Sequence, residues 1–315
     1  MLAILAITGP IYLIIAGGWL AVRHGLFEKA DTRVLGRFVT NICLPALLFR
    51  ALSSHPVRDV LNLQYLLAYG GASMGLMLLW RALNGRLLGQ GPAHATLQGL
   101  GMSSSNSAYV SYPIAAQLLG APAAIGLALT MLVENVLVIP LALALADRQG
   151  EDSRSFAGLG RTLAGLLRNP MIVAIIAGFT VSLTGLPLPG VLARTIDVLA
   201  SASSPVSLFV IGGTLVGLQM NGLWARVGGI AAAKLLVHPA VTVGLMLLMP
   251  GIDPALRTAG LIYAAAPMLS ILPILAQKHH MEALSAAALL VATAFSFATI
   301  SLWLWVAHHL PGLMG

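Results

Sequence analysis

Hydrophobic stretches follow one another along the chain, and most of them are long enough to cross the hydrocarbon core of a bilayer. Because lipid cannot satisfy exposed backbone groups, such stretches are expected to be α-helices. The pattern therefore predicts an all-α membrane protein with ten transmembrane helices. The ten stretches cover residues 3–22, 34–54, 61–80, 96–118, 123–146, 170–185, 191–219, 226–249, 256–276 and 283–307.

The composition supports this interpretation and excludes a soluble globular protein. Of 315 residues, 58% are hydrophobic and 9% charged, against about 25% charged in an average soluble chain. The mean hydropathy is +0.91. Cys43 is the sole cysteine, which excludes an internal disulfide and a cysteine metal site, and we interpret it as a small core residue. The net charge of +7 is dispersed between apolar stretches, so nucleic acid is not an expected partner.

The basic residues predict the orientation in the membrane. With the N-terminus outside, 12 lysines and arginines fall in cytoplasmic connections and 4 on the other side, with Lys234 set aside as intramembrane. We therefore expect a multi-pass protein of the bacterial inner membrane with both termini extracytoplasmic. The first stretch lacks a basic start, so it is expected to be a retained span and not a cleaved signal peptide. Trp19, Trp80 and Trp224 fall at predicted cytoplasmic interfaces.

The two halves of the chain resemble each other. Three pairs of prolines are separated by 160 residues: Pro10 and Pro170, Pro45 and Pro205, and Pro113 and Pro273. The alternative is that two apolar sequences match by chance. Five helices per copy is an odd number, so the second copy must enter the membrane inverted, as in many secondary transporters. We predict a first five-helix repeat over 1–146, a cytoplasmic linker over 147–169 and an inverted second repeat over 170–315.

Polar residues interrupt the fourth and ninth spans at corresponding places. The fourth carries a serine-rich run from Gly101 to Pro113, and the ninth runs from Pro267 through Ser270 to Pro273. Proline removes a backbone donor and clashes with the preceding turn, so both spans are expected to break and to cross near the midplane. The amides left free by such a crossing suit an anionic substrate. Alternatively, each proline only kinks a packed helix whose serines bond back to their own turns.

Asn106 is the first choice for a substrate contact, because its amide lies about 15 Å deep and needs a partner. The further candidates for substrate binding are polar side chains in the same or facing segments, namely Tyr109, Ser111, Tyr112, Ser270 and Asn41. The candidates for the crossover of broken helices are Pro113, Pro267 and Pro273.

Ionisable side chains deep in spans are candidates for coupling. Glu134 lies about 16 Å from either end of the fifth span, so it is neutral, paired or in a cavity, and it could carry a proton. The alternative is a structural role, in which a protonated Glu134 bonds to neighbouring backbone or to Asn41. Asn135 could serve either role. Lys234 either snorkels or supplies a counter-charge to Glu134 or to a carboxylate substrate, whereas His238 is interpreted as a core histidine.

Catalysis finds no support in the sequence. No nucleophile elbow, zinc-protease helix or phosphate-binding loop occurs, and the histidine pairs near span ends are weak evidence for a metal. We expect no enzyme activity, no cofactor and no metal.

Several motifs in combination resemble the auxin efflux carrier family, which includes plant PIN exporters and bacterial permeases described as malonate or malate carriers. They are the segments 41–49, 168–170, 186–189, 205–212, 234–239 and 265–267, together with Pro273. A departure is that Ala108 and Ser111 stand where the family commonly has glycines before Pro113.

The resemblance implies the inverted-repeat fold of NhaA and bile-acid symporters, with crossed broken helices 4 and 9. Helices 1, 2, 6 and 7 would form a scaffold, often dimeric, against which helices 3–5 and 8–10 move like an elevator. It also implies Asn106 near the substrate.

The sequence thus predicts a secondary transporter of a small organic anion, such as malonate, malate or an auxin-like acid, embedded in the lipid bilayer. H⁺ coupling, Na⁺ coupling and downhill transport all stay open, as does a homodimer. The alternatives are a membrane sensor of the same fold that does not transport, or a channel.

Overall fold

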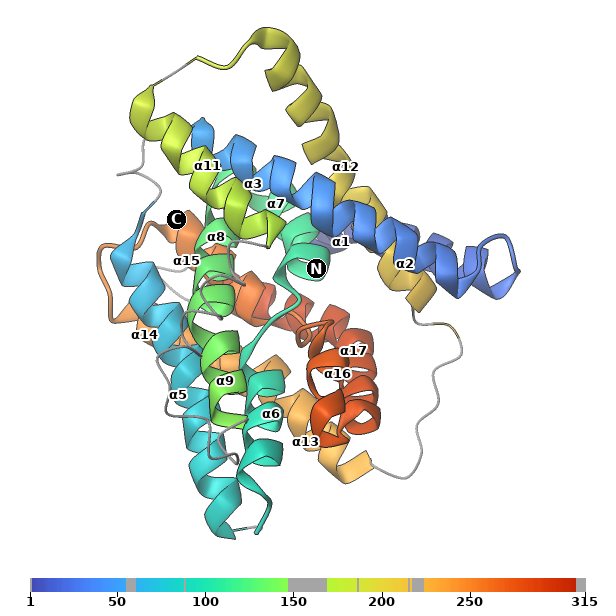
Figure 1. Ribbon diagram of the computed structural model, residues 1–315, viewed down its shortest axis with the longest axis vertical. Helices are drawn as coiled ribbons and strands as arrows, with labels where there is room; N and C mark the ends of the chain where they lie inside the picture. The colour runs from blue at the N-terminus through green and yellow to red at the C-terminus, as the bar shows by residue number, and fades with distance from the viewer. Residues whose placement is uncertain are drawn as a thin grey trace. The chain divides into compact units, whose positions relative to one another are not determined.

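The computed structural model describes residues 2–54, 61–87, 89–146, 169–185, 187–214, 216 and 224–309 (Figure 1). Within these ranges the chain forms helices joined by turns, and no strand occurs there apart from one isolated β-bridge between Ser105 and Met268. The all-α prediction is therefore confirmed for the part of the chain that the structure describes.

The helices follow the predicted hydrophobic stretches. In the first half they are α1 (Leu2–Arg23), α2 (Lys29–Phe38), α3 (Leu44–Ser53), α5 (Leu63–Leu87), α6 (Pro92–Ser103), α7 (Tyr112–Leu119), α8 (Ala121–Leu132) and α9 (Ile139–Ala146). In the second half they are α11 (Pro170–Thr184), α12 (Gly190–Thr214), α13 (Trp224–Ala232), α14 (His238–Leu247), α15 (Pro254–Ala264), α16 (Leu272–Leu275) and α17 (Glu282–His309). A short 3₁₀ turn, η5 (Gln277–His279), precedes α17.

Six of the described helical stretches are long and apolar enough to cross a membrane, in agreement with a multi-pass protein. They are Ala30–Ser53, Leu63–Asn84, Ala121–Ala146, Gly190–Thr214, Trp224–Leu247 and Glu282–His309. Leu13–Arg23 and Pro170–Thr184 are shorter apolar helices. The predicted spans 96–118 and 256–276 contain breaks. Ten spans in two inverted repeats stay a prediction.

Four π-helical turns widen the helices in the described ranges, and each ends two residues before a proline. Proline lacks an N–H and its ring clashes with the carbonyl group four residues earlier, and a wider turn relieves that clash. The residue four positions before each proline lies inside the turn in all four cases. The turns and prolines are η1 (Val39–Cys43) with Pro45, η2 (Ser107–Ser111) with Pro113, η3 (Val133–Val138) with Pro140, and η4 (Ala233–Val237) with Pro239.

Six of the candidate residues named from the sequence lie in these π-helical turns. Asn41 lies in η1, Tyr109 and Ser111 in η2, Glu134 and Asn135 in η3, and Lys234 in η4. Such turns are frequent at functional sites because they present side chains and backbone groups that a regular helix would hold elsewhere.

The chain divides into two compact units, each built from separate stretches of sequence. Unit 1 comprises Met1–Asn62, Ala108–Leu129 and Gly165–Gly217, and unit 2 comprises Leu63–Ser107, Thr130–Ala164 and Leu218–Gly315. The prediction of a first repeat, a linker and a second repeat concerns internal symmetry along the sequence, which this division does not test.

Unit 1 is held together by helices in close backbone contact. Gly18 of α1 lies against the carbonyl group of Phe209 in α12, and Gly212 of α12 lies against the carbonyl group of Ile15 in α1. A Cβ atom at either glycine would overlap the facing backbone. Gly178 brings α11 onto α3 in the same way, because a Cβ there would lie 2.9 Å from Cβ of Leu52. Small residues allow such packing between helices in lipid.

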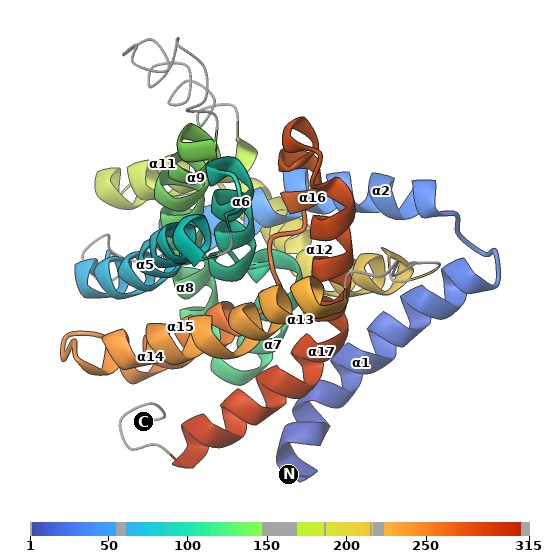
Figure 2. The same cartoon turned by 90° about the horizontal axis from the view of Figure 1, so that it is seen from below.

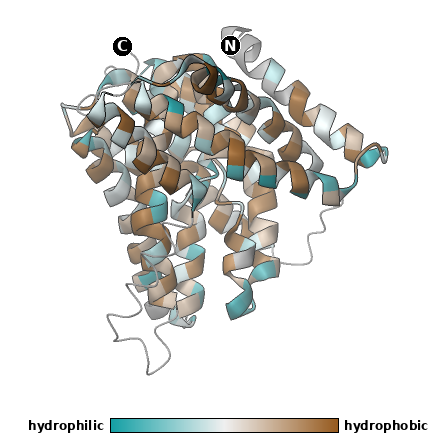
Figure 3. Ribbon diagram, turned by 45° about the horizontal axis from the view of Figure 1, so that its top comes forward, coloured by the Kyte–Doolittle hydropathy of each residue, from teal (hydrophilic) through white to brown (hydrophobic). Residues whose placement is uncertain are grey.

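Unit 2 packs α5 between α6 and α14, while α17 lies across α13 and α16 (Figure 2). Gly99 allows α6 to approach α5, because a Cβ at this position would lie 2.9 Å from the carbonyl oxygen of Met77. A small apolar cluster of Val243, Leu261 and Ala307 is covered by Trp303. Apolar residues predominate along the helices, as Figure 3 shows.

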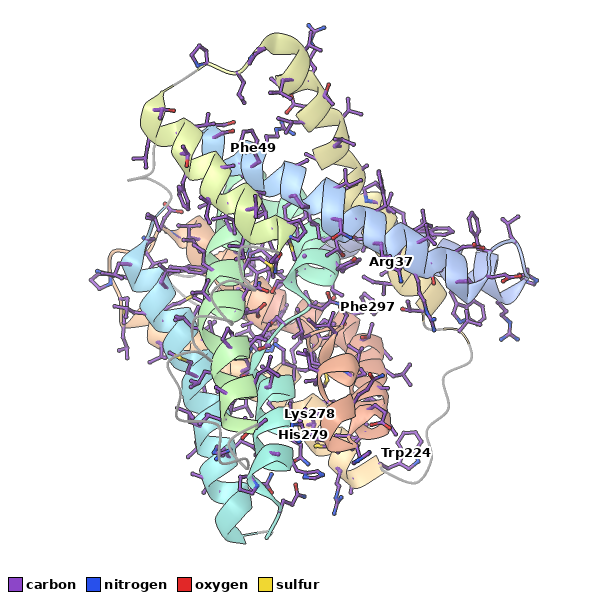
Figure 4. All side chains as sticks on the ribbon, viewed as in Figure 1. Arg37, Phe49, Trp224, Lys278, His279 and Phe297 are labelled. Atoms are coloured by element: carbon purple, nitrogen blue, oxygen red, sulfur yellow. The ribbon has the colours of Figure 1, made fainter. Side chains whose placement is uncertain are left out.

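Trp224 begins α13 and is 64% exposed (Figure 4). The predicted position of its indole ring at a membrane interface stays a prediction, because no bilayer is part of the structure.

Candidate functional site

Two interrupted helices of unit 2 meet through their unwound segments. After α6 ends at Ser103, the chain runs extended at Ser104, and after α15 ends at Ala264 it forms a second irregular segment. The backbone N–H of Asn106 donates to the carbonyl oxygen of Pro267 at 2.8 Å, and that of Leu269 donates to the carbonyl oxygen of Ser104 at 3.3 Å. Each break thereby supplies hydrogen-bond partners that lipid could not give the other.

Lys234 lies fully buried beside this crossover. Its ammonium nitrogen donates to the carbonyl oxygen of Ala264 at 2.6 Å and to Oγ of Ser105 at 2.8 Å, and it lies 2.9 Å from Nδ1 of His238. An ammonium group has three donors: two of them bond oxygen atoms, and Nδ1 of His238 lies within reach of the third. Ala264 is the last residue of α15, where carbonyl groups lack helical partners and carry partial negative charge. Lys234 therefore neutralises a helix C-terminus inside the unit.

His238 orients that ammonium group. Its Nε2 lies 3.0 Å from Oγ of Ser73, and its Nδ1 faces Lys234. If Nδ1 accepts from Lys234, the ring proton sits on Nε2 and donates to Ser73. The histidine is buried and hydrogen-bonded, which agrees with a core role that also positions the neighbouring charge.

Glu134 lies on the other side of Ser105. Its Oε1 accepts from the backbone N–H of Ser105 at 2.8 Å and from the hydroxyl of Tyr69 at 3.2 Å. The carboxyl group is fully buried, and it is linked to Lys234 through Ser105. Of the sequence alternatives for Glu134, a bond to nearby backbone is therefore observed.

Several polar atoms around the crossover make no hydrogen bond with the residues that the structure describes. They are Oγ of Ser104, Oγ of Ser107 and Oε2 of Glu134, all buried. The side-chain amide of Asn106, at 8% exposure, also has no partner among these residues. Buried polar groups are normally satisfied. This concentration of unused donors and acceptors is what a site for a small polar guest requires.

The other candidate residues lie elsewhere. The hydroxyl of Tyr109 donates to the carbonyl oxygen of Gly36 at 2.8 Å and bonds Thr40, within unit 1. The side-chain nitrogen of Asn41 donates to the carbonyl oxygen of Arg37 in its own helix, and Asn41 is exposed. Asn135 likewise donates to the carbonyl oxygen of Met131. These amides and hydroxyls are engaged by neighbouring helical backbone.

Ser111, Tyr112 and Pro113 belong to unit 1 and are buried, whereas Ser270 in unit 2 is exposed. Pro267 takes part in the crossover through its carbonyl group, and Pro273 lies in the short helix α16. Of the residues named from the sequence, the structure thus brings Asn106, Glu134, Lys234 and Pro267 together in unit 2.

Ser105 and Tyr69 escaped the sequence analysis. Ser105 lies at the centre of the network and connects Lys234, Tyr69 and Glu134. Its signal was present, since it belongs to the serine-rich run, but nothing in that run distinguishes it from Ser104. Tyr69 and Ser73 are polar residues in an apolar span, spaced one turn apart, which is a signal that could have been used.

Comparison with known proteins identifies the class. The family described as "Membrane transport protein" matches residues 4–304, so the chain belongs to this family, which is the auxin efflux carrier family that its motifs resemble. The protein is therefore a membrane-embedded, multi-pass transporter of a small molecule, and this membership favours transport over catalysis.

Two relatives can be named. The chain is 28% identical over 303 residues, 94% of each chain, to a protein of Rhizobium meliloti (strain 1021) named "Putative malonate transporter". It is 21% identical over 293 residues, 91% of this chain and 92% of the relative, to an "Uncharacterized transporter" of Methanothermobacter thermautotrophicus (strain Delta H).

Proposed function

We propose that this protein is a secondary active transporter of a small organic anion, a carboxylate such as malonate, malate or an auxin-like acid. Its site is the crossover in unit 2, with Asn106 as the main substrate contact. We place it in a bacterial inner membrane with ten spans, two inverted repeats and both termini extracytoplasmic. The relative named as a malonate transporter supports this choice of substrate class.

The observation that carries the proposal is the set of unused polar atoms at the crossover. The amide of Asn106 and the hydroxyls of Ser104 and Ser107 are donors without partners among the described residues. Lys234 already donates to the carbonyl oxygen of Ala264 at the end of α15. Its positive charge would therefore attract an anion at the crossover without contacting it directly. Together these groups favour a negatively charged guest.

Alternating access would follow from movement of one rigid bundle against another, in the manner of an elevator. The division of the chain into two compact units supports this mechanism, because rigid-body transport requires separately packed bodies. A crossover whose contacts all lie within unit 2 would travel with that unit and carry its substrate along.

A flux experiment tests the substrate site. The full-length protein in proteoliposomes should take up radiolabelled malonate with saturation. Asn106→Ala should reduce the efficiency of malonate uptake, measured as Vmax/KM, by about tenfold or more. The reason is that a lost hydrogen bond to a charged group costs about 1.5–3 kcal/mol. Gln277→Ala, which removes an exposed amide, is the control. Unchanged uptake in Asn106→Ala would exclude this site. Binding without flux would indicate a sensor, and flux without saturation a channel.

The second part of the proposal concerns coupling through Glu134. Its Oε2 has no partner among the described residues, which leaves room for a proton on a buried carboxyl group. In Glu134→Gln, uptake should lose its response to an imposed pH gradient, whereas the wild type should keep it. Exchange of sodium for potassium at fixed pH separates Na⁺ coupling. A Glu134→Gln protein with the same pH response as the wild type would eliminate this role.

A further inference from the structure

Unit 1 contains a cavity that is separate from the crossover contacts described above. Its volume is about 390 Å³, within the range of small-molecule sites. Residues of α3 and of the α7–α8 corner line it, among them Leu47, Arg50, Tyr112, Gly120 and Ala121. None of the described lining residues is acidic. The cavity lies at the end of these helices that the distribution of basic residues predicts to be extracytoplasmic.

Arg50 supplies a charge with spare hydrogen-bonding capacity. Its Nε lies 2.9 Å from Oδ1 of Asp197, and both side chains are about half exposed, at 51% and 50%. The two terminal nitrogens of the guanidinium group have no hydrogen bond with the residues that the structure describes. Exposed ion pairs of this kind contribute little, whereas a guanidinium group binds a carboxylate through two parallel hydrogen bonds. A carboxylate can therefore bind Arg50 or displace Asp197 at small cost.

Tyr112 adds a second donor from an independent element. Its side chain is 9% exposed, it lines the cavity, and its hydroxyl makes no hydrogen bond with any described residue. A phenol that lines a cavity without a protein partner can donate to a group bound there. An anion in the cavity would supply such a group.

The corner between α7 and α8 provides a third contribution. Gly120 has φ of +64°, a conformation that glycine adopts without strain, and it lets α8 begin at the cavity wall. Ala121 and Ala124 in the first turn of α8 line the cavity, so the positive end of the helix dipole lies there. Guanidinium, phenol and helix end thus converge on one cavity.

We propose that this cavity is a carboxylate-binding subsite of unit 1, with Arg50 as the anion-binding residue and Tyr112 as a neutral donor. Asp197 is its exchangeable counter-charge, which holds Arg50 until a carboxylate arrives. The inference rests on the proposed function for the identity of its ligand, the transported organic anion, and it adds a second binding position for that anion.

Calorimetric titration of the purified full-length protein with malonate at constant ionic strength tests the subsite, with neutral malonamide as the comparison ligand. The Asn106→Ala background removes the main contact at the crossover. In that background malonate should still bind, and adding Arg50→Gln should raise its Kd about tenfold, the loss expected for a bidentate charged contact. Tyr112→Phe should raise Kd by a smaller factor, and Asp197→Asn should lower it. Arg194→Gln, which removes an exposed arginine of α12 outside the cavity, is the control for charge.

The outcomes separate the two proposals. Equal malonate binding in Arg50→Gln and Arg194→Gln overturns the subsite and leaves the transport proposal standing. Arg50-dependent binding without malonate flux in the wild type supports the subsite and refutes transport of malonate. Absence of malonate binding in the wild type refutes malonate as the ligand of both sites. If Arg50→Gln does not fold, Arg50→Lys keeps the charge but loses the bidentate geometry, and Tyr112→Phe tests the second donor; unchanged Kd in both variants overturns the subsite.

Discussion

Two charged clusters in this protein differ in their exposure to solvent. In unit 2, Lys234 and Glu134 are fully buried and connected through Ser105. In unit 1, Arg50 and Asp197 form a direct ion pair with both side chains about half exposed. The first cluster exists only because the tertiary structure supplies partners, while the second forms in contact with solvent.

The difference decides how each cluster responds to change. Removing one member of a buried charged network leaves other buried groups unpaired, which is costly. Removing one member of an exposed pair leaves a side chain that solvent can satisfy. Stability should therefore be sensitive to unit 2 and nearly indifferent to the pair in unit 1, whose contribution is to binding.

The largest effect is expected from Lys234→Met. The substitution removes the ammonium group that contacts Ser105, His238 and Ala264, and it leaves the carboxyl group of Glu134 without a nearby positive charge. Unfolding free energy should fall by about 3–5 kcal/mol, and transport should be lost. Thermal unfolding in detergent and malonate uptake measure the two effects. Arg226→Met, which changes an exposed basic residue of the same unit, should do neither, and equal stability of the two variants would contradict the assigned role of Lys234.

The next largest effect is expected from Ser105→Ala, with its neighbour as a matched control. Ser105 accepts from Lys234, whereas the hydroxyl of Ser104 has no partner among the described residues. Loss of the Ser105 hydroxyl should therefore cost about 1–3 kcal/mol of unfolding free energy, while Ser104→Ala should change stability by less than about 0.5 kcal/mol. Denaturant-induced unfolding of both variants tests this pair, and the reverse ranking would refute the network.

A smaller effect is expected from Tyr69→Phe. The substitution keeps the ring stacked on Tyr65 and removes hydrogen bonds to Ser105 and Glu134, each 3.2 Å long. Stability should fall by about 1 kcal/mol. Because the phenol holds Oε1 of Glu134, uptake should also change its dependence on pH, which a purely structural tyrosine would leave unaltered. Tyr263→Phe, which changes another fully buried tyrosine of the same unit, is the comparison variant, and its uptake should keep the pH dependence of the wild type.

The smallest effect is expected in unit 1. A double-mutant cycle of Arg50→Gln and Asp197→Asn should give a coupling energy below about 1 kcal/mol that decreases with added salt. Unfolding measured at low and high ionic strength provides the test. A coupling energy as large as the cost of Lys234→Met would remove the distinction between the two clusters.

Hydropathy and proline positions predicted the helices well, because both act locally. Apolar side chains are most stable in lipid or in the protein core. A proline disturbs the helical turn that precedes it, as at Pro45, Pro113 and Pro239. Interruptions were predicted within Gly101–Pro113 and Pro267–Pro273, and the unwound segments at Ser104–Asn106 and Pro267–Leu269 contact each other. The depth of Glu134 and Lys234 correctly indicated that both are buried.

Partners could not be predicted from the same information. Tyr109, Ser111 and Tyr112 stand close to Asn106 in sequence, yet they belong to unit 1 while Asn106 belongs to unit 2. Ser105 differs from Ser104 only in the direction of its side chain, and this direction depends on how the broken helix enters the crossover. The local sequence around these residues therefore does not indicate which partners each of them contacts.

The chain alone thus sets which residues avoid water, where helices are interrupted and which charged residues are buried, since these are properties of each residue and its near neighbours. Packing sets which groups meet. Lys234 reaches Ser105 and Ala264 across 129 and 30 residues of chain. Such contacts are selected by the fit of whole helices and by the cost of leaving buried polar groups unpaired.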